Sequence, residues 1–225
     1  MAFVGGAANA GLITENLSVV FTHGASINPT NNALYLTATI ADTGPNAVQL
    51  TLTSNLGNQG YNLPSYYVGN FWLEYLSASN GYTASSDLNV SYVSGANATV
   101  TLHNASDQQA DGANRYDINL SFATALLGNN GTAVFNITAK NGATFSAANF
   151  AQPGTLGGAN SAVPGYVAAA AVFDNPTGGQ INDSQTFLIG APVPEPTSLV
   201  SWTALAALVG LCGAIRHRKS NKRLG

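Results

Sequence analysis

The sequence predicts a mainly β protein: an antiparallel β-sandwich, with the jelly roll as a close variant, followed by a single C-terminal transmembrane helix. Three observations lead to this fold class. Several short segments alternate apolar and polar residues, as strands with one buried face do. Turns rich in Gly and Asn separate these segments. No segment before residue 191 shows sustained helical periodicity.

The clearest strand is expected over residues 116–122, whose apolar and polar side chains alternate without exception. The same alternation predicts strands over residues 34–40, 48–53, 88–92 and 99–102. Further strands are expected over residues 17–22, 71–76, 132–139, 166–173 and 186–189, and one helical turn over residues 145–150. About ten short strands joined by frequent turns are typical of a sandwich.

The expected connections contain Gly and Asn, which tolerate positive φ and so close tight turns. Such turns are predicted at residues 42–45, 79–81, 94–95, 129–131 and 141–142. Looser surface loops are expected at residues 57–60 and 152–165.

Charge is scarce and unevenly distributed. Charged residues make up 8% of the chain, against about 25% in an ordinary soluble protein. Ten acidic and only two basic residues lie at or before Glu195, so this part has a net charge of −8, while five of the seven basic residues lie in the last ten. A body this acidic repels phosphates, which argues against nucleic acid as a partner. A neutral-polar surface of amides and hydroxyls suits an exported β protein.

The C-terminal residues change character. Pro194 and Pro196 lack the N–H that a strand ladder needs, so this segment is expected to be extended and accessible. Residues 197–215 carry no charge and, as a helix, would span about 28 Å, close to the roughly 30 Å hydrocarbon core of a membrane. A basic stub follows, with Arg216, Arg218, Lys219, Lys222 and Arg223. The positive-inside rule places this stub in the cytoplasm and the body outside.

Three parts are therefore expected. Residues 1–11 are a remnant of a signal peptide, or a flexible terminus; Ala8-Asn9-Ala10 matches the A-x-A end of a cleavage site, although residues 1–10 have neither a basic nor a long apolar stretch. We expect the true start of the protein to lie upstream of Met1. Residues 12–190 form the extracytoplasmic sandwich. Residues 191–225 form a tail with a motif at 193–196, a span at 197–215 and a stub at 216–225.

The order of Val193-Pro194-Glu195-Pro196, an apolar span and an Arg-rich stub resembles the PEP-CTERM sorting signal of bacteria that produce exopolysaccharide. The resemblance covers residues 193–225. It implies recognition by an exosortase, a membrane-embedded protease or transpeptidase that cuts near the motif and delivers the body to the cell surface. The precursor would lie in the inner membrane. The body resembles, over residues 116–122, 133–139, 145–150 and 166–170, the β-rich segment that often precedes this tail, for which chemistry is mostly unassigned.

No catalytic residue, metal ligand or cofactor is predicted. His23 and His103 belong to no metal-ligand spacing, and His103 is expected to be a surface residue at a strand end. The single cysteine, Cys212, lies in the apolar span, where burial makes a thiol inert. Asp87, Asp107, Asp111 and Asp117 are expected to be solvated loop acids rather than a calcium loop or a glycosidase pair.

Aromatic side chains suggest one alternative. Trp72 with Tyr75, or Tyr66 with Tyr67, would stack on a sugar ring if exposed, but buried or half-buried positions are expected. The first functional hypothesis is a non-enzymatic structural or adhesive surface protein in contact with exopolysaccharide. The alternative is an exported carbohydrate-binding or carbohydrate-active protein with the same tail. A permanently anchored single-pass protein differs only in the fate of the tail.

Overall fold

A computed structural model describes residues 11–23, 33–58, 66–76, 84–103, 108–109, 114–123, 127–152, 155–156, 166–174 and 185–192. The chain divides into two compact units, Met1–Val193 and Pro194–Gly225. All described residues belong to the first unit.

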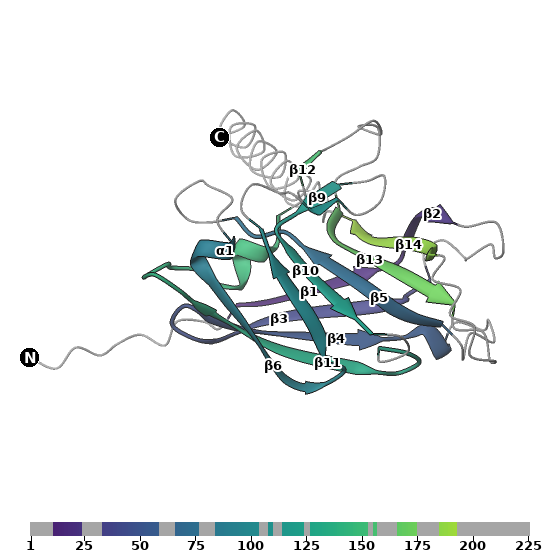
Figure 1. The fold of residues 1–225 in the computed structure, drawn as a ribbon, viewed down its shortest axis with the longest axis horizontal. Helices are drawn as coiled ribbons and strands as arrows, with labels where there is room; N and C mark the ends of the chain where they lie inside the picture. Colours follow the sequence, from purple (N-terminus) through teal and green to yellow (C-terminus); the bar gives the residue numbers. More distant parts are fainter. Residues whose placement is uncertain are drawn as a thin grey trace, which may run out of the picture. The chain divides into compact units, whose positions relative to one another are not determined.

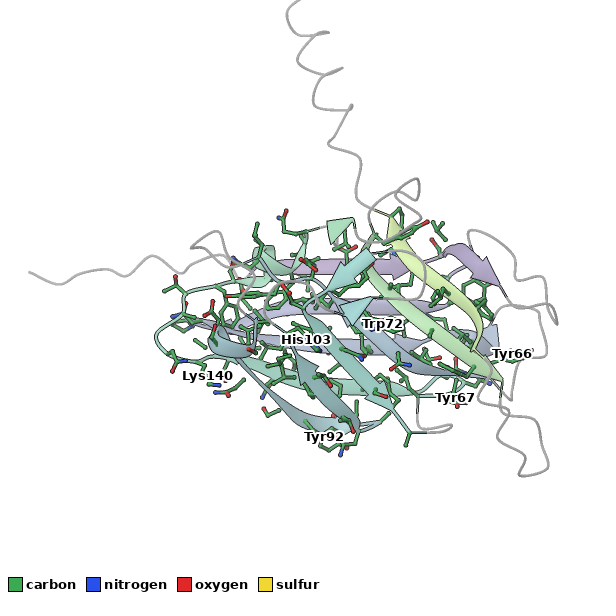
Figure 2. All side chains as sticks on the ribbon, turned by 45° about the horizontal axis from the view of Figure 1, so that its top comes forward. Tyr66, Tyr67, Trp72, Tyr92, His103 and Lys140 are labelled. Atoms are coloured by element: carbon green, nitrogen blue, oxygen red, sulfur yellow. The ribbon has the colours of Figure 1, made fainter. Side chains whose placement is uncertain are left out.

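Two large antiparallel sheets form most of the described part (Figure 1; Figure 2 gives a second view). The first sheet has the order β1 (Leu12–Leu17), β3 (Leu36–Gly44), β4 (Ala47–Ser54), β11 (Thr132–Ala139), β6 (Leu88–Gly95). The second sheet has the order β2 (Val19–His23), β14 (Gln185–Pro192), β13 (Tyr166–Asp174), β5 (Tyr66–Leu73), β10 (Ile118–Phe122), β7 (Ala98–Leu102). A small third sheet has the order β12 (Thr155–Leu156), β9 (Asn114–Tyr116), β8 (Gln108–Gln109).

Helical structure in the described residues is limited to the short α1 (Ala84–Asp87) and the 3-10 turns η1 (Leu56–Asn58) and η2 (Ala147–Phe150). The prediction of a mainly β, sandwich-like body is therefore confirmed, and η2 lies inside the predicted helical turn. No helix among the described residues is long and apolar enough to cross a membrane. The predicted span at 197–215 lies outside the described residues.

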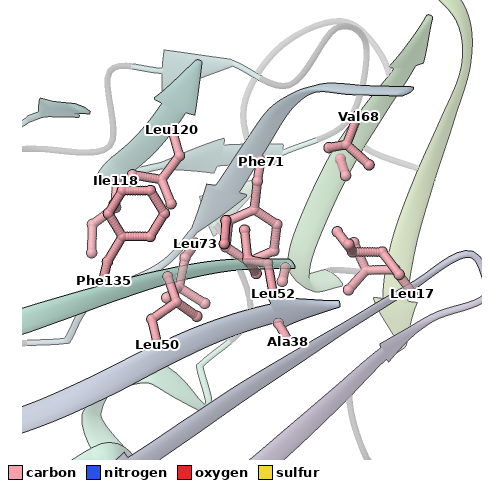
Figure 3. Packing of buried hydrophobic residues seen from close by; sticks show 14 of the residues in the cluster. Leu17, Ala38, Leu50, Leu52, Val68, Phe71, Leu73, Ile118, Leu120 and Phe135 are labelled. Carbon is pink, nitrogen blue, oxygen red and sulfur yellow. The ribbon is translucent and has the colours of Figure 1, made fainter. Parts of the chain in front are cut away.

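The main core lies between the two large sheets, where alternate side chains point toward each other (Figure 3). In β4 the burial alternates residue by residue, so that Val48, Leu50 and Leu52 are fully buried, as the sequence predicts. Phe135 of β11 contacts one ring from the facing sheet and one from the adjacent strand. Its centroid lies 6.4 Å from that of Phe122 in β10 and 6.2 Å from that of Tyr92 in β6.

The chain crosses between the large sheets at both sides of the sandwich. Ser18 alone joins β1, an outer strand of the first sheet, to β2, an outer strand of the second. At the other side, Ala96 and Asn97 join β6 to β7. Gly95 has a φ of +80° at this second corner, and the Ala96 N–H donates to the Thr132 carbonyl at 2.7 Å. Short corners of this kind carry the chain directly from one sheet to the other and so fix how the two sheets lie against each other.

The structure corrects two predictions of an unbroken strand. The single strand expected at 17–22 is wrong, because Leu17 ends β1 and a second strand in the other sheet begins at Val19. The unbroken strand expected at 116–122 is wrong, because the chain bends at Asp117 between β9 and β10. Tyr116 consequently packs in a second apolar cluster, apart from the inward-facing Ile118.

The boundary expected between body and tail also shifts. Residues 191 and 192 belong to β14, where Ala191 pairs with Ala168, and Pro192 with Tyr166. A proline fits there because pairing of β14 with its other neighbour, β2, ends at Gly190, so no ladder N–H is missing on that side. The strand predicted over residues 34–40 begins at Leu36 in the structure. Before it, Leu34 is exposed and Tyr35 is buried, the reverse of the predicted alternation.

Three turns contain asparagines with positive φ: Asn46, Asn130 and Asn141. Asn130 and Asn141 lie in predicted turns, and Asn46 follows the predicted turn at 42–45. The turn predicted at 79–81 lies outside the described residues.

Candidate functional site

The residues predicted to direct sorting lie outside the described part of the chain. They are the motif residues Val193, Pro194, Glu195 and Pro196 and the stub residues Arg216, Arg218, Lys219, Lys222 and Arg223. Asp107 and Asp111 also lie outside it, and of His23 only the backbone is described, in β2. The structure therefore locates Asp87, Asp117, His103 and the four aromatic residues.

The expectation of solvated acids is wrong for Asp117, which is fully buried. It lies in the bend between β9 and β10, directly before the first residue of β10 in the second sheet. Asp87 is half-buried at the end of α1, where its carboxylate accepts hydrogen bonds of 3.4 Å from the Tyr75 hydroxyl and from Ser86 Oγ. His103 is not a simple surface residue either, since its Nε2 atom is buried.

The aromatic side chains considered for sugar stacking are buried, as preferred from the sequence: Tyr66, Tyr67, Trp72 and Tyr75 (the first three are labelled in Figure 2). Tyr67 stacks on Phe173 with a centroid separation of 5.8 Å. Tyr75 belongs to the main core and contacts Phe150 at 5.4 Å.

Strand register brings polar residues from three neighbouring strands to one end of the second sheet. Ile118 of β10 pairs with Leu73 of β5 on one side and with Leu102 of β7 on the other. One residue further along, Glu74, Asp117 and His103 therefore lie in one row, and the His103 N–H donates to the Asp117 carbonyl at 2.8 Å. We call this row, together with the paired residues Trp72 and Asn119 two positions further along the same strands, the buried polar cluster.

The two carboxyl groups of this cluster are almost completely buried, whereas His103 and Asn119 are half-buried. Glu74 is 1% exposed and Asp117 0%. Four buried atoms here have no hydrogen-bond partner among the described residues: both Glu74 carboxyl oxygens, Trp72 Nε1 and His103 Nε2. Because buried polar atoms in folded proteins are nearly always bonded, such a concentration marks a place where a proton, a water molecule or another group is needed.

Electrostatics favour a proton. Burial, with a further contribution from the nearby Asp117 charge, raises the pKa of Glu74 from 4.5 to about 9. Glu74 is therefore a neutral acid at pH 7, able to donate a hydrogen bond, beside a second carboxyl group. Both carboxyl groups are buried away from the surface.

Sequence reasoning missed Glu74 and also Glu15, which occupies an inward position of β1 and is 4% exposed. Burial raises the pKa of Glu15 to about 7. The signal was present in both cases: each is the only charged residue in a strand-like segment, at 12–17 and at 71–76. An acid at an apolar position of such a segment indicates a buried carboxyl group.

Among the described residues, no three His, Cys, Asp or Glu side chains are arranged to hold a metal ion. The cluster thus offers proton chemistry from a carboxyl pair. Compared with known proteins, the chain matches no family model, no curated protein and no solved structure.

Proposed function

We propose that this chain is an exported bacterial surface or matrix protein with a structural or adhesive role, sorted by an exosortase through residues 193–196. The observation that carries the proposal is the order of three features within the last 33 residues: a Pro-Glu-Pro motif, an uncharged span and a basic stub. Pro-Glu-Pro alone is a weak signal. The three features in this order are a strong signal for the PEP-CTERM type of sorting tail.

The physics of the tail supports this orientation. Five basic residues in the stub are attracted to the anionic cytoplasmic face of the membrane by about 1 kcal/mol each. The span is just long enough to cross, so the motif would lie close to the outer surface. Its prolines prevent it from joining a strand ladder, which leaves the backbone accessible to a membrane protease.

The fold of the body is compatible with cleavage at that point. The last described strand, β14, ends at Pro192 and pairs with both β13 and β2. A cut near Glu195 would therefore remove none of the described strands. The sandwich would keep its core after processing, as a displayed protein requires.

A non-enzymatic role agrees with where candidate groups lie. The aromatic rings and the acid pair that a carbohydrate site would present are buried in the described part of the body. Contact with exopolysaccharide would then use surface hydroxyls and amides. The carbohydrate-active alternative is favoured by one observation, the Glu74–Asp117 pair, since glycosidases use two neighbouring carboxyls with one pKa raised. Glycoside turnover that disappears in Glu74→Gln would select this alternative.

The sorting proposal is tested in a host that contains the sorting enzyme, by immunoblots of membrane and extracellular fractions. Changing Pro194, Glu195 and Pro196 together to Ala leaves the apolar span intact, so insertion should persist while the full-length form accumulates in the inner membrane. A matched control changes Thr197, Ser198 and Ser201 to Ala and should be released normally. Equal release of the motif variant and the wild type would show that residues 193–196 are not the sorting signal.

The same fractions test the rest of the tail. Removing the basic stub should impair retention and orientation before cleavage, because the attraction to the cytoplasmic face is lost. Mass spectrometry of the released protein should find a C-terminus close to Glu195. Release of a protein that still contains residues 197–215 would contradict the proposal.

A further inference from the structure

Gly11, the first described residue, is held by the carboxylate of Asp42. The Gly11 N–H donates to Asp42 Oδ2 at 2.7 Å, and the Asp42 N–H donates back to the Gly11 carbonyl at 2.9 Å. The other carboxylate oxygen, Oδ1, accepts a 2.7 Å hydrogen bond from the Ala147 N–H at the start of η2. Asp42 therefore ties the beginning of β1 to β3 and to η2.

The contact is close enough to require glycine. A Cβ atom added at residue 11 would lie 2.7 Å from Asp42 Oδ2 and 3.6 Å from the Ala147 Cβ. The Asp42 carboxylate cannot withdraw without losing its bond to the Ala147 N–H. A larger residue at position 11 would thus break one of the two carboxylate contacts.

The three residues just before this contact match the A-x-A pattern at the end of a signal-peptide cleavage site. Ala8-Asn9-Ala10 places small residues three positions and one position before the Ala10–Gly11 bond, as signal peptidases require. Cleavage of that bond would make the Gly11 nitrogen the first atom of the mature chain. The atom released by cleavage is the one that already contacts Asp42.

We propose that the Ala10–Gly11 bond is hydrolysed during export and that the new α-ammonium group of Gly11 forms an ion pair with Asp42. Water supplies the hydroxyl that completes the carboxyl group of Ala10, and the Gly11 nitrogen takes up protons to become –NH₃⁺. The inference rests on the proposed export of the protein. Before cleavage the carboxylate accepts from an uncharged amide N–H, and after cleavage it accepts from a charged ammonium group, which adds the attraction between two opposite charges.

The surroundings strengthen the effect. Gly11 and Asp42 are both half-buried, so solvent screens the pair less than it screens an exposed one. The new positive charge also enters a body whose net charge is −8 up to Glu195. Processing would then lock the first strand onto β3 and η2 in the mature protein.

The cleavage is tested by N-terminal sequencing of the protein recovered from the outside of cells that express its native gene. The expected first residue is Gly11. Exported protein that begins at another residue would overturn this inference and leave the sorting proposal intact. Failure of export would instead contradict the proposed function.

The ion pair is tested separately, on purified chains that begin at Gly11 and end at Gly225, one with a free amino group and one with an acetylated Gly11. Acetylation keeps the N–H donor and removes the charge. We expect the free amine to raise the unfolding temperature by about 3–6 °C. This difference should disappear in Asp42→Asn and persist in Asp87→Asn, a half-buried control. Equal unfolding temperatures for the two wild-type chains would overturn the ion pair.

Discussion

Glu74 and Asp117 face each other one residue beyond the pair formed by Leu73 of β5 and Ile118 of β10, and both are buried. The Asp117 charge disfavours ionisation of Glu74 and adds to the larger effect of burial, which together raise the pKa of Glu74 to about 9. Glu74 therefore keeps its proton at neutral pH. This relationship makes the stability of the sandwich depend on pH.

Glu74→Gln should make the stability of the body less dependent on pH. The pKa of Glu74 is raised from 4.5 to about 9 in the folded protein, so folding takes up a proton between these values. Stability is then fully present below pH 4.5 and is lost as the pH rises toward 9, by up to about 1.4 kcal/mol per pH unit. Gln mimics the neutral acid. Urea unfolding at pH 5, 7 and 9 should show a steeper loss for the wild type, and parallel losses would contradict the prediction.

Glu15→Gln should stabilise the protein above pH 7. Burial raises the pKa of Glu15 from 4.5 to about 7, so its contribution to stability is lost as the pH rises through this window. At pH 8 the wild type carries a buried charge that Gln removes, for a gain on the order of 2–3 kcal/mol. At pH 4 the two proteins should unfold alike. A gain of the same size at both pH values would show that ionisation of Glu15 is not the cause.

Glu15→Leu tests a second role of this residue. β1 is an outer strand of the first sheet, and inward-pointing charges on such strands discourage pairing between molecules. Leu should stabilise the monomer at pH 8 and increase self-association, measured by sedimentation. Unchanged association at high protein concentration would argue against the second role.

Gly95→Ala should destabilise the protein far more than Gly142→Ala. Both glycines have positive φ, +80° and +75°. A Cβ at Gly95 would lie too close to the Thr132 carbonyl oxygen, whereas a Cβ at Gly142 meets nothing within 4 Å. We expect a cost of about 1 kcal/mol for Gly142→Ala from backbone strain alone, and at least about 2 kcal/mol more for Gly95→Ala. Equal melting temperatures for the two variants would contradict this account of the corner.

Phe135→Ala should cost about 3–5 kcal/mol, because it opens a cavity in the main core where Phe122 and Tyr92 pack. Tyr92→Phe serves as the control, since it keeps the ring and removes only the exposed hydroxyl bond to the Gly95 carbonyl. That change should cost under about 1 kcal/mol. Chemical denaturation of both variants provides the measurement.

Local alternation was enough to predict much of the fold. In β4 and β11 the inward side chains are those that the pattern indicates, and β11 has the predicted bounds, 132–139. These predictions work because successive side chains of a strand point to opposite faces. The asparagines at 130 and 141 close turns for an equally local reason, their tolerance of positive φ. The aromatic residues 66, 67, 72 and 75 are buried, as their apolar surroundings suggest.

Tertiary structure decided the rest, because strand pairing depends on residues far apart in the chain. By itself, the sequence determined that the body is β-rich and where most strands lie. It did not determine that one residue, Ser18, separates strands of different sheets, or that Asp117 breaks an alternating segment. Glu74, Asp117 and His103 form a row only because β5, β10 and β7 become neighbours in one register. The contact of Gly11 with Asp42 likewise follows from β1 pairing with β3, 31 residues apart in sequence.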